Sequence, residues 1–235
     1  MVTMNTQTAS AMPVINIDII SDLVSPWCYV GMRRLEQALA RFEGASVPTI
    51  SWRPFEINPA LPPEGVGVDE YLRTVFGTAD AGRAALDEVA LEGERDGIRF
   101  AFDRVSTVPN TLDAHRLILM AEEAGAGKRM ADRLFRGFLE EGRDIGRKEV
   151  LAELAEDVGF GRQGVREQLS GDRFRAAVRA MEARVRGAGL SGVPSIIVNK
   201  RVAVMGVQDR DTIVSVIDQA LFHSLSSPEK GQVIH

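Results

Sequence analysis

The stretch that decides the fold is SDLVSPWCYVG, residues 21–31. It follows a short apolar run rich in β-branched residues, 14–20, which is typical of a buried strand. Ser25 is a good N-cap and Pro26 is favoured at the first helical position, so a strand should turn directly into a helix here. Apolar residues then follow the spacing of one face of an amphipathic helix. They are Cys28, Met32, Leu35, Leu39 and Phe42.

The first turn of this helix has two interpretations. Free backbone amides and the helix dipole stabilise negative charge there, so the turn could lower the pKa of the Cys28 thiol or hold a bound anion. The alternative is structural, because Ser-Pro is an ordinary helix start and a lone cysteine is usually a small buried hydrophobic residue. Residues 25–28 on their own favour the structural interpretation.

The rest of the chain reads as two α/β ends around a helical block. Residues 47–55 alternate as a second strand, and residues 58–67 form a loop rich in proline and glycine. The predicted helices are 69–76, 80–95, 112–124, 130–140, 149–158 and 172–185, with a short extended link at 98–102. Two more strands, 195–198 and 202–205, flank a tight turn at Asn199-Lys200. A last helix begins at Asp209 or Asp211.

This order predicts an α/β protein with an inserted all-helical domain. The α/β unit combines residues 14–60 with 187–222, and the insertion is 61–186. A disordered leader, 1–13, and a flexible tail, 223–235, are expected at the two ends.

Composition narrows the classes of function. The chain has 235 residues, 45% of them hydrophobic, and a net charge of -5, which argues against nucleic acid as a partner. No apolar run is long enough to cross a membrane. A single cysteine excludes an intramolecular disulfide, and the first 12 residues lack the pattern of a secretory signal, so we expect a cytoplasmic protein. One cysteine and three scattered histidines predict no metal site.

Residues 21–31 resemble the active-site segment of the DsbA family, in its FrnE-like branch, which commonly carries Cys-Pro-Trp-Cys-Tyr here. Further segments match in the same order, and together they cover roughly residues 14–222. They are Arg53-Pro54-Phe55, Asn58-Pro59, residues 109–116 and Gly192-Val193-Pro194-Ser195. The resemblance implies a thioredoxin fold with an inserted helical domain. It also implies that Pro194 follows a cis bond and faces the turn at residues 25–28.

The departure from this pattern is Ser25, which replaces the first, nucleophilic cysteine of the family. A hydroxyl has no disulfide chemistry, so the dithiol cycle is unavailable within this chain. The main hypothesis is a DsbA-like thiol-disulfide oxidoreductase with a modified, monothiol site. Cys28 would then react with protein or peptide thiols and disulfides.

A serine at this position also resembles two glutathione-dependent branches, the kappa-class glutathione transferases and the 2-hydroxychromene-2-carboxylate isomerases. In them the serine hydroxyl hydrogen-bonds the thiolate of bound glutathione. Residues 206–210, GVQDR, resemble their Gly-x-Asp-Arg segment with one extra residue, which makes Gln208 and Asp209 candidate ligands. Asn58 matches an asparagine that holds the ligand backbone. The second hypothesis is therefore an isomerase or transferase in which Ser25 stabilises the thiolate of glutathione or another low-molecular-weight thiol.

A third hypothesis is a binding module or chaperone that pairs a substrate strand with the backbone at Val193. Under all three, no cofactor is tightly bound, and the oligomeric state stays open, a homodimer included. Trp27 could line a groove or pack internally, and His115 is more consistent with a structural hydrogen bond than with a catalytic base. The predicted catalytic residues are Ser25 and Cys28. The predicted ligand-binding residues are Pro26, Trp27, Asn58, Val193, Pro194, Gln208 and Asp209.

Overall fold

The computed structural model describes residues 14–43, 47–190, 192–222 and 232–234. The predicted leader lies outside the described residues, as does most of the predicted tail.

A five-stranded mixed sheet, in the order β2-β1-β5-β6-β7, forms the centre of the α/β part. β1 runs parallel to β2 and antiparallel to β5, which pairs antiparallel with β6. Strands from both ends of the chain thus share one sheet, which confirms the predicted thioredoxin-like architecture. The strands are β1 (Val14–Ser21), β2 (Val47–Pro54), β5 (Ser195–Val198), β6 (Val202–Met205) and β7 (Gln232–Ile234).

The last strand corrects one expectation. The sequence predicted a flexible tail over 223–235, but Gln232–Ile234 pairs in parallel with β6 over Val202–Val204. A segment of three residues is too short to show an alternating pattern, so only its pairing partner reveals it.

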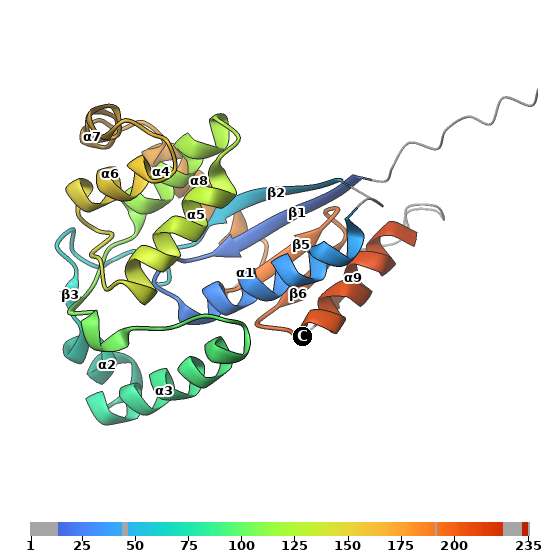
Figure 1. Ribbon diagram of the computed structural model, residues 1–235, viewed down its shortest axis with the longest axis horizontal. Coiled ribbons are helices and arrows are strands. Elements are labelled where there is room, and N and C mark those ends of the chain that lie inside the picture. The colour runs from blue at the N-terminus through green and yellow to red at the C-terminus, as the bar shows by residue number, and fades with distance from the viewer. Residues whose placement is uncertain (1–13, 44–46, 191, 223–231, 235) are drawn as a thin grey trace, which may run out of the picture.

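Two helices, α1 (Pro26–Leu39) and α9 (Arg210–Phe222), cover one face of the sheet side by side (Figure 1). A 3₁₀ turn, Ala40–Phe42, extends α1. Alternate residues of β1, among them Ile15 and Ile17, are buried in the hydrophobic cluster beneath these helices. Each such side chain contributes about 1.5–3 kcal/mol when fully buried. The predicted buried strand and the predicted amphipathic helix therefore pack on each other.

The β5–β6 hairpin turns at Asn199 and Lys200, whose φ angles are 51° and 56°. Positive φ at both central residues is the geometry of a type I′ turn, which asparagine tolerates well. The predicted tight turn is confirmed.

The inserted segment contains seven α-helices within the described residues. They are α2 (Val68–Phe76), α3 (Ala79–Arg95), α4 (Leu112–Glu123), α5 (Gly127–Phe135), α6 (Lys148–Glu156), α7 (Arg162–Ser170) and α8 (Arg175–Gly187). All six predicted helices are present, and a π-helical turn, Arg136–Glu140, continues α5. α7 was not predicted, because only Val165 and Leu169 in it are buried and its periodic signal is weak.

The insertion is not all-helical, which is a second correction. β3 (Val66–Gly67) pairs antiparallel with β4 (Thr107–Val108) as a separate two-stranded sheet. Residues 98–101, expected to be extended, form no strand, and a 3₁₀ turn, Phe102–Arg104, follows them. Strands of two residues form because they pair with a distant segment, so no local sequence pattern predicts them.

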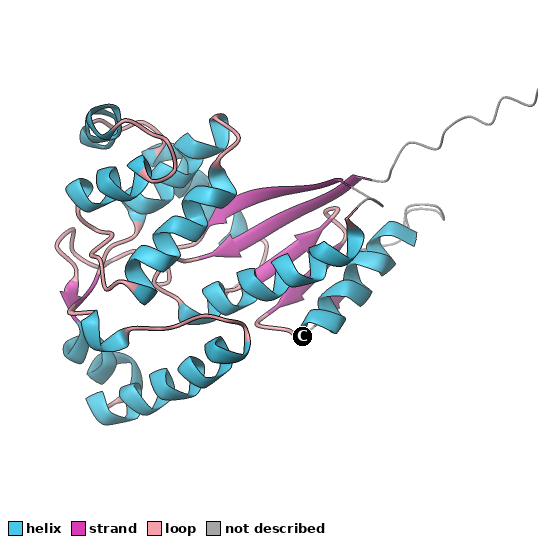
Figure 2. Ribbon diagram, in the orientation of Figure 1, coloured by secondary structure: helices cyan, strands magenta, loops and turns pink. Residues whose placement is uncertain are grey.

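The insertion shares its core with the α/β unit. One cluster of buried residues includes Ile17 and Leu35 together with Leu117 and Phe135. α4 and α5 contact β2, and α3 contacts α1. Figure 2 shows the inserted helices beyond the end of the sheet where β1 passes into α1. The division at residues 60 and 187 stays a prediction, since the packing is continuous across it.

Candidate functional site

The turn between β1 and α1 has the geometry that its residues favour. Ser25 is extended, with φ -87° and ψ 112°, and Pro26 occupies the first helical position. The Ser25 hydroxyl oxygen accepts a hydrogen bond from the Cys28 backbone amide at 3.2 Å. Ser25 is thus the N-cap of α1, as predicted, and the first turn of this helix contains no acidic residue.

Cys28 is part of the core. Only 2% of the residue is exposed, and it packs in the main hydrophobic cluster. Burial raises the pKa of the Cys28 thiol from 9.0 to about 11, and the nearby hydroxyls of Ser21 and Ser25 counteract part of this rise. At neutral pH the sulfur is a protonated thiol inside the protein.

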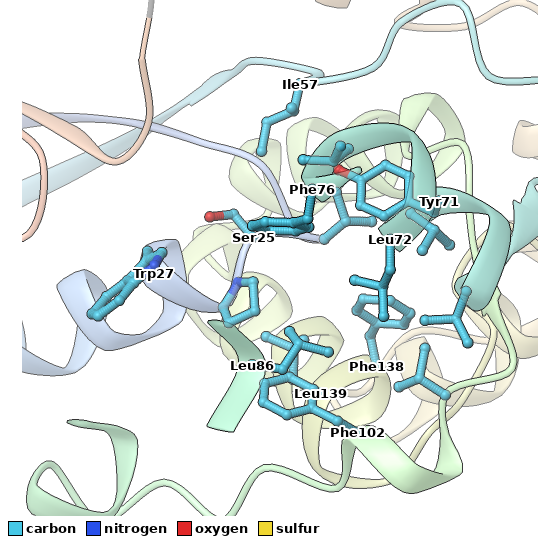
Figure 3. Close-up of a pocket in the computed structure, with 16 residues that line it drawn as sticks. Ser25, Trp27, Ile57, Tyr71, Leu72, Phe76, Leu86, Phe102, Phe138 and Leu139 are labelled. Carbon is cyan, nitrogen blue, oxygen red and sulfur yellow. The ribbon is translucent and has the colours of Figure 1, made fainter. Parts of the chain in front are cut away.

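A cavity of about 230 Å³ opens beside the turn, between the α/β unit and the inserted helices (Figure 3). Ser25, Pro26 and Trp27 form one wall, whereas Cys28 does not reach it. The remaining lining residues come mainly from α2 and from the region around β4 and the π-helical turn. They are Val24, Ile57, Val68, Tyr71, Leu72, Val75, Phe76, Leu86, Phe102, Val105, Val108, Phe138 and Leu139.

Four of the lining residues are unusually exposed for large apolar side chains. Trp27 and Ile57 are each 39% exposed, Phe76 44% and Val75 51%. Apolar surface gathered in this way around a concavity is typical of a binding site. Trp27 is therefore a wall residue of this cavity and not a core residue.

Asn58 lies next to the cavity but does not line it. Its side-chain amide donates a hydrogen bond to the Tyr71 hydroxyl at 3.0 Å. Burial raises the pKa of Tyr71, so the phenol is protonated at neutral pH. The predicted role of Asn58 toward a ligand backbone stays untested, while its contact with Tyr71 positions a hydroxyl at the cavity wall.

Pro194 packs against α1. The Val193–Pro194 bond is cis, and a Cβ placed on Gly31 would lie 3.1 Å from Cγ of Pro194. Within the described part of the chain, no hydrogen bond occupies the backbone N–H or carbonyl of Val193. These two groups are available to an extended ligand.

Gln208 and Asp209 lie before α9 and outside the cavity lining. The Gln208 amide donates to the Met205 carbonyl at 3.0 Å. Both oxygens of Asp209 accept from Thr212, one from its amide and one from its hydroxyl, each at 2.8 Å. The hydrogen bond from the Thr212 amide lowers the pKa of Asp209. Asp209 is the helix cap that the sequence suggested, and its predicted ligand role stays a prediction.

A buried polar network lies behind the turn. Asp22 accepts from the Thr111 hydroxyl at 2.8 Å and from the Ile57 amide at 2.7 Å. His115 accepts from the Trp52 indole through Nδ1 at 3.1 Å, and its Nε2 lies 3.4 Å from Asp22. With Nδ1 accepting, the neutral ring carries its proton on Nε2, toward Asp22. His115 is fully buried and makes a hydrogen bond to Trp52, the kind of contact that the sequence favoured for it.

Sequence reasoning did not single out Asp22 as a site residue. Its place in the segment 21–31, two residues past the predicted end of a buried strand, was the available signal.

Residues 16–218 match the profile of the DsbA-like thioredoxin domain family. The chain belongs to this family. Among curated proteins, it is 26% identical over 204 residues to the uncharacterized protein YwbO of Bacillus subtilis (strain 168), covering 86% of this chain and 96% of that one.

Solved structures share the DsbA-like fold. A probable DsbA oxidoreductase from Streptomyces coelicolor superposes with a TM-score of 0.81 at 28% identity, over 92% of this chain and 93% of that one. A 2-hydroxychromene-2-carboxylate isomerase superposes with a TM-score of 0.68 at 16% identity, over 90% of this chain and 100% of that one. The cytosolic disulfide reductase DsbM from Pseudomonas aeruginosa, in a structure with GSH, superposes with a TM-score of 0.60 at 20% identity. The match covers 89% of this chain and 98% of that one.

Two further findings concern metal binding and membrane-spanning helices. In the ranges that the structure describes, no group of three or more His, Cys, Asp or Glu side chains is placed to hold a metal ion. Nor does any described helix combine the length and apolar character needed to span a bilayer.

Proposed function

We propose that this DsbA-like protein is a thiol-dependent isomerase or transferase, in which Ser25 holds the thiolate of a low-molecular-weight thiol such as glutathione. One observation carries the proposal. Ser25 caps α1 at the wall of the cavity, whereas Cys28 is buried and its pKa is raised. The group that can meet a ligand is the hydroxyl, and the family's reactive thiol must come from a second molecule.

The geometry at Ser25 suits a thiolate. The hydroxyl oxygen accepts from the Cys28 amide, and its hydrogen would donate to the sulfur of a bound thiol. The first-turn amides of α1 add favourable dipoles. A donor and a helix N-terminus together favour the ionised form of a bound thiol and lower its pKa. The open backbone of Val193 would pair with the peptide part of such a thiol.

The cavity would hold the second substrate next to this sulfur. The thiolate attacks an electrophilic carbon, a C–S bond forms, and the displaced π-electron pair moves to an acceptor atom of the substrate. In an isomerisation that pair returns and the C–S bond breaks, so the thiol is regenerated. In a transfer the adduct takes up a proton and leaves. Neither course consumes an oxidant or a reductant.

Disulfide exchange through Cys28 is the second candidate. The family and the 28% identical neighbour described as a probable DsbA oxidoreductase support it. It requires the buried sulfur to become accessible to protein or peptide disulfides, and a second thiol to resolve the mixed disulfide. A cytoplasmic location, where low-molecular-weight thiols are kept reduced, suits both candidates.

Two variants separate the candidates. The proposal predicts that Ser25→Ala raises the pKa of bound glutathione and lowers thiol-dependent turnover by about 10- to 1000-fold, as when one preorganised donor is lost. Cys28→Ser should leave that turnover within about twofold. Both are assayed with a glutathione-dependent double-bond isomerisation, with bound-thiolate absorbance followed against pH, and with a protein disulfide.

The reverse order, in which Cys28→Ser abolishes disulfide exchange and Ser25→Ala is tolerated, would establish the second candidate. Peptide binding without either activity would point to a binding module.

A further inference from the structure

The cavity beside Ser25 has no charged wall. None of its lining residues is an aspartate, glutamate, lysine, arginine or histidine. Among side chains, only Ser25, Tyr71 and the Trp27 indole offer a polar hydrogen there. Away from the first turn of α1, a ligand charge placed inside would lose its hydration without gaining a counter-ion, which is costly. The cavity therefore suits an uncharged body.

Its size and lining suit a small ring system. The volume of about 230 Å³ exceeds the roughly 150 Å³ of an engineered apolar cavity that binds benzene. Aromatic rings from three separate segments, Phe76, Phe102 and Phe138, surround it in Figure 3. Aromatic walls favour flat apolar ligands through stacked and edge-to-face contacts. One or two fused rings would fill this space.

The Tyr71 hydroxyl provides direction within this apolar space. Asn58 donates to its oxygen at 3.0 Å, which orients the phenol and leaves its hydrogen free. Burial keeps the group protonated. In Figure 3 the hydroxyl is directed from the α2 side toward the side where Ser25 lies. An acceptor atom on a ring ligand, such as a carbonyl oxygen, would meet this donor.

We propose that the cavity binds uncharged one- or two-ring compounds bearing a hydrogen-bond acceptor, and that Tyr71 binds the acceptor. Tyr71 is then a specificity-determining residue and Asn58 positions it. This inference rests on the proposed function for its link to catalysis, since a carbonyl held by Tyr71 would receive the electron pair displaced by the thiolate. Binding of the ring compound requires no thiol.

A matched set of naphthalenes tests the proposal by calorimetric titration of the full chain without any thiol. 2-Acetylnaphthalene carries a carbonyl acceptor, 2-ethylnaphthalene has nearly the same shape without it, and 2-naphthoate carries a charge. We expect the acetyl compound to bind most tightly and the naphthoate at least about 10-fold more weakly, because no lining residue pairs with its charge.

Tyr71→Phe should weaken binding of the acetyl compound by about 3- to 10-fold, the effect of losing one net hydrogen bond. Its affinity for the ethyl compound should be unchanged. The matched control is Tyr29→Phe, since Tyr29 is the only other tyrosine and its hydroxyl bonds Glu140 and Arg33 outside the cavity. That variant should bind both compounds as the wild type does. Circular dichroism verifies that each variant is folded at the titration temperature.

Any one of three results would overturn the inference. They are an equal loss of affinity for the acetyl and ethyl compounds in Tyr71→Phe, tight binding of the naphthoate, and the absence of binding by all the naphthalenes. Because the titration contains no thiol, it is independent of the Ser25→Ala assay. Ring binding without thiol-dependent turnover would contradict the proposed function alone, and thiol-dependent turnover in a protein that binds no naphthalene would contradict this inference alone.

Discussion

At the scale of single residues, the site depends on which side chain borders the cavity. Ser25 and Cys28 are three positions apart on one helical turn, yet Ser25 borders the cavity and Cys28 joins the core. The first residues of α1 line the cavity, whereas Cys28, the third residue of this helix, packs in the core. With Ser25 at the cavity wall, the thiol of this turn is that of Cys28, which is buried.

The raised pKa of Cys28 has a consequence for stability. Because the folded state holds the thiol protonated, its contribution is fully present below about pH 9 and is lost as the pH rises toward 11. Two units of pKa correspond to about 2.7 kcal/mol of unfolding free energy. We expect the free energy of unfolding of the wild type to fall over this range more steeply than that of Cys28→Ala. Urea unfolding at several pH values measures the difference between the two slopes.

Alkylation provides an independent check of the same residue. The native protein should react with iodoacetamide far more slowly than the urea-unfolded chain at pH 8. Equal alkaline slopes in the two proteins, or fast alkylation of the native thiol, would mean that Cys28 is accessible and would favour the disulfide-exchange candidate.

At the scale of elements, α1 carries a constraint that its own sequence does not reveal. Gly31 lies in the interior of the helix, where alanine would ordinarily gain about 1 kcal/mol. Pro194, from the other end of the chain, packs on it so closely that an added methyl would lie 3.1 Å from the ring. Gly31 is therefore a packing residue between α1 and the loop before β5.

Paired substitutions test this constraint. Gly164 lies within α7 with open space around it, so Gly164→Ala should raise the free energy of unfolding by about 0.5–1 kcal/mol. Gly31→Ala should give no such gain, and Gly31→Val should lose about 1–3 kcal/mol through overpacking. Urea unfolding measures all three variants. A stabilising Gly31→Ala of the same size as Gly164→Ala would show that Pro194 moves aside freely.

At the scale of the whole molecule, Asp22 joins three distant segments. It follows β1, accepts the amide of Ile57 after β2, and accepts the hydroxyl of Thr111 at the start of α4. Ile57 is also a cavity residue. One buried carboxylate therefore connects the α/β unit, the insertion and the rim of the site.

A double-mutant cycle measures this connection. Asp22→Ala and Thr111→Val should each destabilise the protein, and their joint effect should differ from the sum by about 1.5–3 kcal/mol, the usual value of a hydrogen bond to a charged group. The control is a second cycle of Arg83→Ala and Asp69→Ala, an ion pair in which both side chains are about half exposed. The coupling free energy of this pair should be less than about 1 kcal/mol. Additive effects in the Asp22 cycle would show that the buried bond does not hold the two parts together.

The sequence by itself determined the order of the long strands and of most helices, and the nature of the turn at residues 21–31. The local signals are the apolar, β-branched run at 14–20, the helical spacing from Cys28 to Phe42, the Ser-Pro cap and the Asn199-Lys200 turn. Each corresponds to the predicted element in the structure. Local patterns suffice here because the buried face, the cap and the positive φ are set by neighbouring residues.

Only the tertiary structure decided which residues share a site. It brought Tyr71, Phe102 and Phe138 to the wall next to Ser25, and it left Gln208 and Asp209 outside that wall. It also made two-residue strands of Val66–Gly67 and Thr107–Val108 and added β7 to the sheet. These features arise from contacts between segments far apart in the chain. Burial and hydrogen-bond pairing across such distances leave no periodic trace in the sequence.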